Sequence, residues 1–135
     1  MDAQQPRTGG INHVNLVVSD LERSQSFYRH ALGFEDAGAN PETGLTFLRT
    51  PGRDDLLGLQ VAGGVLDRLA GKPRRPGDSG GVDHIGFAVE SPAMLDRLVE
   101  AVEAHGGSLL WRSQNEMGEE SAFVTDPDGY VLQLG

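Results

Sequence analysis

The sequence contains no cysteine, no long apolar run and comparatively little positive charge. Without cysteine there are no disulfides, no thiolate metal ligands and no thiol nucleophile. No apolar stretch approaches the roughly 20 residues that a membrane-spanning helix needs. The opening MDAQQPRTGG lacks the apolar segment of a secretory signal. The chain is therefore expected to be a soluble, cytoplasmic protein without a membrane partner.

Eleven Lys and Arg residues stand against twenty Asp and Glu residues, which gives a net charge of −9. A charge of this sign argues against binding to nucleic acid, because phosphate backbones are held by cationic patches. Phosphate loops, G-x-G-x-x-G and H-E-x-x-H are also missing. The 135 residues correspond to a single domain, residues 1–135. The partner expected from these absences is a small-molecule ligand or substrate.

An internal repeat organises the chain. Residues 9–18 read GGINHVNLVV and residues 80–89 read GGVDHIGFAV, at a constant offset of 71 (84 − 13). Each copy continues with a helical pattern and then three strand-like segments. The sequence predicts an α+β fold of two tandem βαβββ modules, at about residues 9–62 and 80–135, with a linker at about 63–79. The linker contains one short helical turn at Val65–Ala70 and a basic stretch, KPRR at 72–75, interpreted as a solvated loop.

Turn and cap residues mark the boundaries of the elements. Ser19 is predicted to cap the first helix, which Gly33 ends, and Ser91 followed by Pro92 begins the second. The DPDG sequence at 126–129 predicts a type I turn. The predicted strands span 11–18, 34–37, 44–50 and 55–62 in the first module, and 82–90, 108–114, 119–125 and 130–134 in the second.

Strand alternation places one histidine of each module on the face away from the helix. His13 and Asn15 lie opposite the apolar Val14, Leu16 and Val18. His84 lies in the same way opposite Ile85, Phe87 and Val89. The two histidines thus occupy matching positions on a face that must be concave or an interface.

Each last strand carries a glutamine inside an apolar run. Gln60 follows His13 by 47 residues, and Gln133 follows His84 by 49. These near-equal spacings predict that the four polar side chains converge around a pseudo-two-fold axis, in the kind of concavity that binds small molecules.

The chain resembles the vicinal oxygen chelate superfamily, which includes glyoxalase I, extradiol dioxygenases, methylmalonyl-CoA epimerase, and fosfomycin- and bleomycin-resistance proteins. The resemblance covers both modules and lies in INHV (11–14), VSDLERS (18–24), FYR (27–29), LGF (32–34), DHIGF (83–87) and DPDGY (126–130). It is specific for the fold and poor for the reaction. It implies sheets that curl into a cup-like partial barrel, commonly in a homodimer.

The resemblance also implies a divalent metal, Ni, Zn, Co, Mn or Fe, on His13, Gln60, His84 and Gln133. The family's usual last ligand is Glu, and Gln133 stands in its place. Four neutral ligands attract a dication less strongly, and glutamine does not act as a base toward a carbon-bound proton. No catalytic base is assigned. The carboxylates still to be placed are Glu35, Glu42, Glu116, Glu119 and Glu120.

Two functions remain open at this point. The first is a metal-assisted glyoxalase- or dioxygenase-like enzyme of lyase, isomerase or ring-cleaving type, acting on a small oxygen-bearing molecule. The second is a metal-free binding protein of the bleomycin-resistance kind, which sequesters a ligand in the cup.

Phe123 is a further aromatic on a predicted strand that either lines the cup or belongs to the core. The residues predicted to contact the substrate are Asn15, Phe47, Arg49, Gln60, Trp111 and Gln133.

Overall fold

The computed structural model describes residues 5–70, 74–78 and 82–135. The first module consists of β1 (Val14–Val18), α1 (Leu21–His30), β2 (Glu35–Asn40), β3 (Leu45–Arg49) and β4 (Leu57–Val61). The second module consists of β5 (Ile85–Phe87), α3 (Pro92–Ala104), β6 (Ser108–Gln114), β7 (Glu120–Thr125) and β8 (Val131–Leu134). Each module has the predicted order of strand, helix and three strands.

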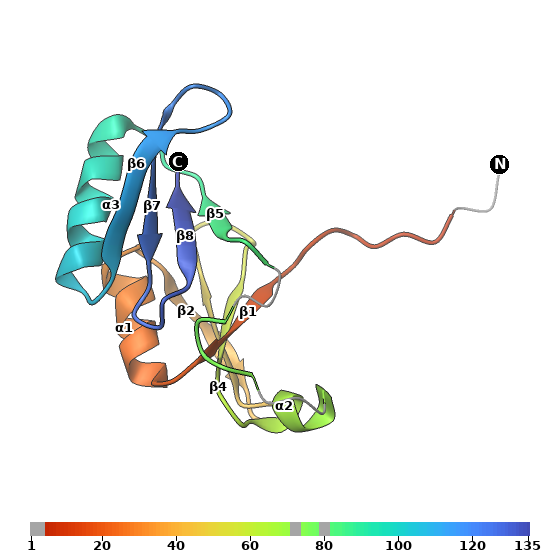
Figure 1. Cartoon of the computed structure of the whole chain (residues 1–135). Coiled ribbons are helices and arrows are strands. Elements are labelled where there is room, and N and C mark those ends of the chain that lie inside the picture. The colour runs from red at the N-terminus through yellow and green to blue at the C-terminus, as the bar shows by residue number, and fades with distance from the viewer. Residues whose placement is uncertain (1–4, 71–73, 79–81) are drawn as a thin grey trace.

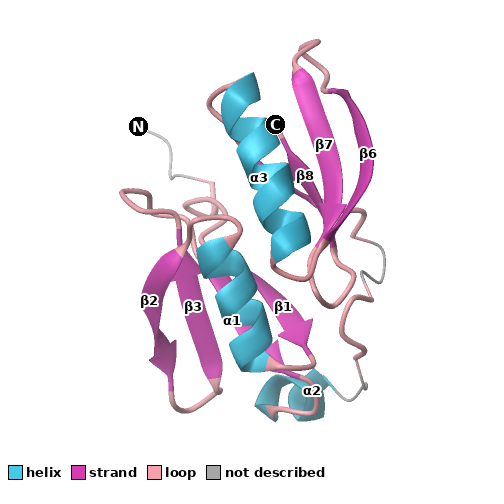
Figure 2. Ribbon diagram, turned by 90° about the vertical axis from the view of Figure 1, so that its left-hand side faces the viewer, coloured by secondary structure: helices cyan, strands magenta, loops and turns pink. Residues whose placement is uncertain are grey.

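The two modules form separate four-stranded sheets with the same topology. The strand orders are β1-β4-β3-β2 and β5-β8-β7-β6, and the sheets do not close into a barrel. In each sheet the first strand runs parallel to the last, and the remaining neighbours are antiparallel. Both long helices lie on the same side of the strands (Figure 1) and face the viewer in Figure 2. Among the described residues, no long helix covers the opposite face of either sheet.

A single apolar cluster lies between the sheets and the two long helices. Leu16 and Val18 are fully buried in it, as the alternation of β1 predicts, whereas Val14 at the start of the strand is 40% exposed. The apolar stripes of α1 and α3 cover this side of the sheets. Its buried members include Phe27, Tyr28, Phe34, Leu48, Leu59, Leu95, Val99, Val102, Val124, Leu132 and Leu134.

The helix caps agree with the sequence in one module and differ in the other. Ser91 caps α3 as predicted, accepting a hydrogen bond from the Met94 N–H at 3.1 Å. The prediction for Ser19 is wrong, because Asp20 caps α1 and accepts from the Arg23 N–H at 3.0 Å. Within the described residues, no helix has both the length and the apolar character needed to cross a membrane.

The linker is helical where the sequence predicts it. α2 spans Val65–Ala70. Arg74 of the basic stretch forms an ion pair with Asp67, to which its Nε donates at 2.6 Å. The Gly63 N–H also donates to Asp67 and, together with Arg74, holds the pKa of this carboxyl below its usual value. Lys72, Pro73, Gly80 and Gly81 lie outside the described residues.

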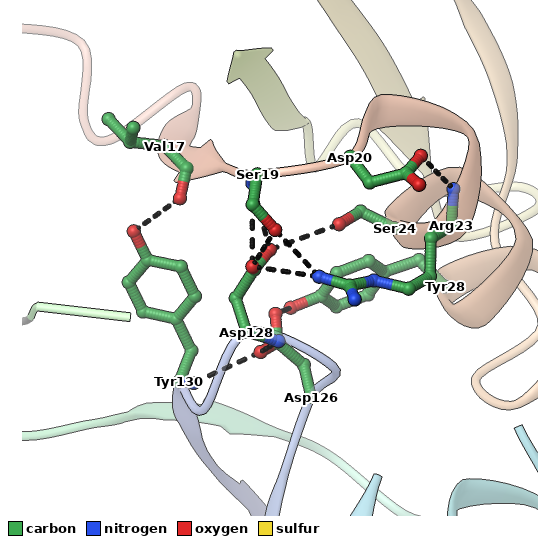
Figure 3. Close-up of polar contacts among 9 residues, drawn as sticks. All are labelled: Val17, Ser19, Asp20, Arg23, Ser24, Tyr28, Asp126, Asp128 and Tyr130. Atoms are coloured by element: carbon green, nitrogen blue, oxygen red, sulfur yellow. Dashed lines mark hydrogen bonds and ion pairs between the residues drawn. The ribbon is translucent and has the colours of Figure 1, made fainter. Parts of the chain in front are cut away.

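The DPDG turn of the second module docks on the start of α1 in the first (Figure 3). The Gly129 N–H donates to the Asp126 carbonyl at 3.0 Å, which confirms the turn. Asp128 accepts from the Ser19 hydroxyl at 2.6 Å and from the Arg23 guanidinium at 3.0 Å. A carboxylate at a helix N-terminus is favoured by the unpaired N–H groups there. This contact explains why Ser19 does not act as the cap.

Two tyrosines complete the junction between the modules. The buried Tyr28 hydroxyl donates to Asp126 Oδ2 at 2.7 Å, and the Tyr130 hydroxyl donates to the Val17 carbonyl at 2.7 Å. Burial raises the pKa of the Asp126 carboxyl despite its hydrogen bonds. Burial and the neighbouring Asp126 also raise the pKa of Tyr28 well above its ordinary value. The turn therefore holds the two modules together.

Candidate functional site

The site begins with one row of residues across the open face of the second sheet. Gly86, Gln133, Phe123 and Trp111 stand opposite one another on β5, β8, β7 and β6. Directly paired residues point to the same side of a sheet. His84 precedes β5 by one residue and shares the side of Gly86, as the sequence predicts. These side chains therefore form one continuous surface opposite the helix layer.

His84 and Gln133 are in direct contact on this surface. His84 Nε2 lies 3.0 Å from Gln133 Oε1, and the Gln133 amide nitrogen donates to the Ser121 hydroxyl at 3.0 Å. The other ring nitrogen, Nδ1, lies 3.0 Å from Asp83 Oδ2. Ser121 is buried at 1% exposure, whereas Asp83 is 95% exposed in its side chain. The four residues form a polar chain that runs from the strand edge into the sheet.

Aromatic rings border this polar chain. Phe123 meets His84 edge to face, with centroids 5.2 Å apart, and Trp111 lies nearly parallel to Phe123 at 5.9 Å. Trp111 is 61% exposed although it lies on the face predicted to bind the substrate. A β-bulge between Leu109 and Trp111 accompanies this exposure. The surface therefore combines a flat apolar area with a polar end, which suits a planar molecule bearing oxygen atoms.

The first module repeats part of this arrangement. His13 lies one residue before β1 and is exposed, and its Nδ1 is hydrogen-bonded to the preceding residue, Asn12. Its ring meets Phe47 edge to face at 5.9 Å, just as His84 meets Phe123. Phe47 is thus the counterpart of Phe123. The predicted histidine and aromatic positions correspond between the modules.

Gln60 does not occupy the position of Gln133. Gln133 stands opposite Gly86, two residues after His84, whereas the residue opposite Asn15, two residues after His13, is Gly58. Gly58 follows His13 by 45 residues (58 − 13) and Gln133 follows His84 by 49 (133 − 84), so the first module is four residues shorter here. Gln60 is buried, and its amide donates to the Thr43 carbonyl.

Asn15 fills the space that Gly58 leaves open. A Cβ atom on Gly58 would overlap Asn15 Oδ1 and would lie 3.2 Å from the Phe47 ring. The Asn15 side chain therefore lies across β4 beside Phe47. Each module thus has one amide and one glycine at this pair of positions, but the strands that carry them are exchanged. The first has Asn15 on β1 and Gly58 on β4, and the second has Gly86 on β5 and Gln133 on β8.

Two hollows lie along the seam where β1 and β5 approach each other. One, of about 220 Å³, is lined by residues of β1, of the linker, of β5 with the residues just before it, and of the start of β8, including Asn15, Arg75, His84 and Tyr130. The other, of about 170 Å³, is largely apolar and includes His13, Phe34 and Phe87. Asn15 and His84 therefore share a cavity, whereas His13 borders a different one.

The remaining predicted residues lie outside the polar chain. Arg49 is exposed at the end of β3, opposite Glu35 on β2. The unplaced carboxylates Glu35, Glu42, Glu116, Glu119 and Glu120 are all exposed. In the parts of the chain that the structure describes, no three His, Asp or Glu side chains gather in a way that would hold a metal ion. A catalytic base therefore remains unassigned.

Of the four predicted metal ligands, His84 and Gln133 are brought into contact. The 3.0 Å between His84 Nε2 and Gln133 Oε1 is a hydrogen-bond distance, and the amide oxygen accepts when Nε2 carries the proton. Imidazole nitrogen and amide oxygen are ordinary donors for divalent ions. The structure thus brings two of the four predicted donors together, and the ligand roles of His13, Gln60, His84 and Gln133 all stay predictions.

Two features of the site were not predicted from the sequence. One is the contact of Ser121 with Gln133. The other is that Asn15 on β1, rather than a glutamine on β4, supplies the amide of the first module. A signal for Ser121 was present, because the DPDG turn fixes the register of β7 and β8. Counting outward from the turn places Thr125 opposite Val131 and Phe123 opposite Gln133. Ser121 then follows as the next β7 residue on the same face. No comparable signal exists for Gly58, because its connection to β3 has no turn of defined register.

Most of the chain is similar to known proteins. A family model described as the Glyoxalase/Bleomycin resistance protein/Dioxygenase superfamily matches residues 10–134. A 2,2',3-trihydroxybiphenyl dioxygenase of Sphingomonas paucimobilis is 27% identical over 93% of this chain, which spans 40% of that enzyme's length. A probable lactoylglutathione lyase of Vibrio parahaemolyticus is 28% identical, over 93% of this chain and 89% of that protein. The crystal structure of a glyoxalase-related enzyme from Fulvimarina pelagi superposes with a TM-score of 0.75 at 25% identity, covering 94% and 87% of the two chains.

Proposed function

Because the chain belongs to the Glyoxalase/Bleomycin resistance protein/Dioxygenase superfamily, we propose that it is a metal-assisted enzyme acting on a small oxygen-bearing molecule. The observation that carries this proposal is the contact between His84 Nε2 and Gln133 Oε1 at the end of an aromatic surface. A lyase, isomerase or ring-cleaving reaction fits such a site. The similarity to a dioxygenase and to a probable lyase supports these reaction classes.

His84 and Gln133 are the residues that would hold the metal, and His13 and Gln60 are the proposed further ligands. A bound divalent ion would supply Lewis-acid chemistry to two adjacent oxygen atoms of the substrate. The chain's own residues have separate tasks. Trp111 and Phe123 bind and orient the planar part of the substrate, and they exclude water from that side. The Asp83 carboxylate fixes the second ring nitrogen of His84.

A metal-free binding protein is the second candidate, and the donor set favours it. Neither His84 nor Gln133 carries a negative charge when the imidazole is neutral, so attraction for a dication is weak. An amide and an imidazole also bind the oxygen atoms of a ligand directly by hydrogen bonds. In that case a planar oxygen-bearing molecule is sequestered without turnover, in contact with Trp111, Phe123, His84 and Gln133.

We also propose that the protein acts as a homodimer in the cytoplasm, with a small molecule rather than a nucleic acid as its partner. Large apolar side chains near the start of β1 and β5 are exposed, with Ile11 at 92% and Val82 at 61%. Exposed apolar side chains of this size are typical of surfaces that a second chain covers. The net charge of −9 supports a small-molecule partner.

The experiment compares the parent with His84→Ala and His13→Ala, which each remove one of the two proposed histidine ligands. Mn²⁺ is titrated calorimetrically, and catechol, a planar diol, is titrated against the fluorescence of Trp111, the single tryptophan of the chain. The enzyme proposal predicts Mn²⁺ binding by the parent, weakened by about tenfold or more in His84→Ala, because one of two adjacent ligands is lost. His13→Ala also weakens Mn²⁺ binding, because His13 is a proposed ligand of the same ion.

The two candidates give different results in this experiment. Catechol quenching that requires Mn²⁺ supports the enzyme. Catechol quenching of equal strength with and without Mn²⁺ supports the binding protein. If His84→Ala and His13→Ala retain the parent's affinity for both probes, the proposed site is wrong.

A further inference from the structure

The β-bulge on β6 adds one residue, Leu110, to the edge of the second sheet. Leu109 pairs with Val124 and Trp111 pairs with Phe123, so two steps along β6 correspond to one step along β7. The extra residue of such a bulge has no partner on the neighbouring strand. Beyond Trp111 the pairing is regular again. The bulge therefore adds one side chain without changing the register of the rest of the strand.

The contacts of the flanking residues show to which side the extra side chain points. Leu109 packs against the apolar cluster, and the Arg112 guanidinium donates to Asp96 of α3 at 2.8 Å. Both residues thus face the helices, although residues three apart on a regular strand face opposite sides. Leu110 and Trp111, which lie between them, are on the open side of the sheet, where both are more than half exposed.

Both side chains border a hollow on this open face. The hollow measures about 290 Å³, and its lining residues are Asp83, His84, Leu110, Trp111, Phe123 and Val131. It therefore has a polar end before β5 and an apolar end on β6. β5 and β6 are the outer strands of the sheet, three strand spacings or about 14 Å apart. A single ring held at His84 is shorter than this width, so the apolar end lies beyond the ring.

The first module has the same bulge without the large side chains. The three steps along β2 from Asp36 to Ala39 correspond to two steps along β3, so β2 also contains one extra residue. The residues between them are Ala37 and Gly38, in place of the leucine and tryptophan of β6. The fold thus forms this bulge with small side chains as well. The apolar end of the hollow is therefore a property of the second module's sequence and not a requirement of the backbone.

We propose that Leu110 is a specificity-determining residue, which contacts an apolar substituent on the side of the ligand's ring opposite its oxygen atoms. The inference rests on the proposed function, because it concerns the ligand of the same face. It narrows that ligand to a ring with oxygen atoms at one end and an apolar branch at the other. The branch covers Leu110 and Trp111 and removes their apolar surface from water. One methylene group in a hydrophobic pocket changes affinity by about tenfold or more.

The test compares catechol with 4-tert-butylcatechol, whose apolar branch points away from the two hydroxyl groups. Both diols are titrated against the fluorescence of Trp111 in the full chain, with Mn²⁺ and without oxygen. The parent is expected to bind the branched diol about tenfold more tightly than catechol. In Leu110→Ala this preference falls to about threefold or less, whereas the affinity for catechol itself stays within about threefold of the parent's, because the unbranched ring does not reach Leu110.

Met117→Ala is the matched control. Met117 is an exposed apolar side chain in the connection between β6 and β7, away from the residues that line the hollow. Its truncation is expected to leave the preference for the branched diol unchanged. An equal loss of preference in Met117→Ala and Leu110→Ala would mean that the branch binds exposed apolar side chains without regard to the hollow, and would overturn the inference.

A second measurement locates the branch directly. The tert-butyl protons of the bound diol give one NMR signal, for which nuclear Overhauser contacts with the Leu110 methyl groups and the Trp111 ring are expected. Contacts instead with Val14 or Ile85, in the larger hollow between β1 and β5, overturn the role of Leu110, as does an unchanged preference in Leu110→Ala. A parent that binds both diols equally overturns this inference and leaves the proposed function standing. A parent that binds neither diol overturns both.

Discussion

The two modules share a topology but differ in the side-chain contacts that their matching strands and turns make. Each has a histidine before its first strand, a polar residue bonded to that histidine and a phenylalanine edge-on to its ring. They differ at the first and last strands, where Gln133 reaches His84 while Gln60 bonds to Thr43. They differ again at the turn between the third and fourth strands. The comparison shows that equal backbone positions do not produce equal sites when the connections differ in length.

The connections between the third and fourth strands also differ between the two modules. The DPDG turn of the second module contacts α1 of the first through Asp126 and Asp128. The corresponding connection of the first module, residues 50–56, is mostly exposed, and Asp55 there accepts from the Thr50 N–H of the same loop at 2.8 Å. One turn therefore joins the modules, and the other stabilises only its own loop.

The largest expected effect tests this junction. Tyr28→Phe removes the hydroxyl that donates to the buried Asp126 carboxylate, and a hydrogen bond to a charged group contributes about 1.5–3 kcal/mol. The free energy of unfolding in urea should fall by that amount. Tyr130→Phe is the matched control, because its hydroxyl donates to the neutral Val17 carbonyl, for which about 0.5–1.5 kcal/mol is expected. Equal losses would show that the buried carboxylate has no special part in joining the modules.

The features predicted correctly are those that depend on local pattern. The repeat, the order of elements, the buried side of β1 and the DPDG turn all follow from periodicity and turn chemistry. Ser91 was predicted as a cap for the same reason and is one. Ser19 was not predicted correctly, because its hydroxyl bonds to Asp128, more than a hundred residues away in the chain. Capping rules that consider only neighbouring residues do not take such a distant hydrogen-bond partner into account.

The position of the fourth strand in the first module could not be predicted for a related reason. A shift of two residues along a strand leaves every side chain on the same face, so alternation does not distinguish Gly58 from Gln60. The spacing of 47 residues for His13 to Gln60 resembled the 49 for His84 to Gln133, but the register shows a true spacing of 45. The pairing of β1 with β4 identifies Gly58 as the residue opposite Asn15, which alternation alone does not.

The second prediction tests the exchange of amide and glycine. Gly58→Ala places a Cβ on Asn15 Oδ1 and should destabilise the fold by about 1–2 kcal/mol, as overpacking does. The same substitution in an Asn15→Gly background should cost little, because the space is then free. Urea unfolding of the four chains gives the coupling free energy, which for residues in contact is about 0.5 kcal/mol or more.

The control for this cycle is the glycine of the other module. Nothing lies within 4 Å of a Cβ built on Gly86, so Gly86→Ala should be tolerated and should stabilise by about 0.4–1 kcal/mol through the unfolded state. A Gly58→Ala chain as stable as Gly86→Ala, or additive effects of Gly58→Ala and Asn15→Gly, would mean that Asn15 does not occupy the space over Gly58.

The smallest expected effect concerns the pH dependence of the junction. Burial raises the pKa of Asp126 in the folded state above its ordinary value of 3.8, so the ionised carboxylate opposes folding relative to the protonated one. This unfavourable contribution is fully present above the raised pKa. It is relieved as the pH falls through the raised pKa towards 3.8, and each unit of pKa difference corresponds to about 1.4 kcal/mol.

Asp126→Asn removes this titration while keeping an oxygen for the N–H groups of Asp128 and Tyr130, which donate to Oδ1 at 2.9 and 3.0 Å. The stability of the variant relative to the parent should therefore be constant above the raised pKa, and should decline as the pH falls below it. Chemical unfolding between pH 7 and pH 3 measures this difference, with Asp55→Asn in the exposed connection of the first module as the control. A relative stability that rises on acidification would mean that the hydrogen bonds of Asp126 outweigh its burial. The junction would then be held by an ionised carboxylate, and low pH would separate the modules.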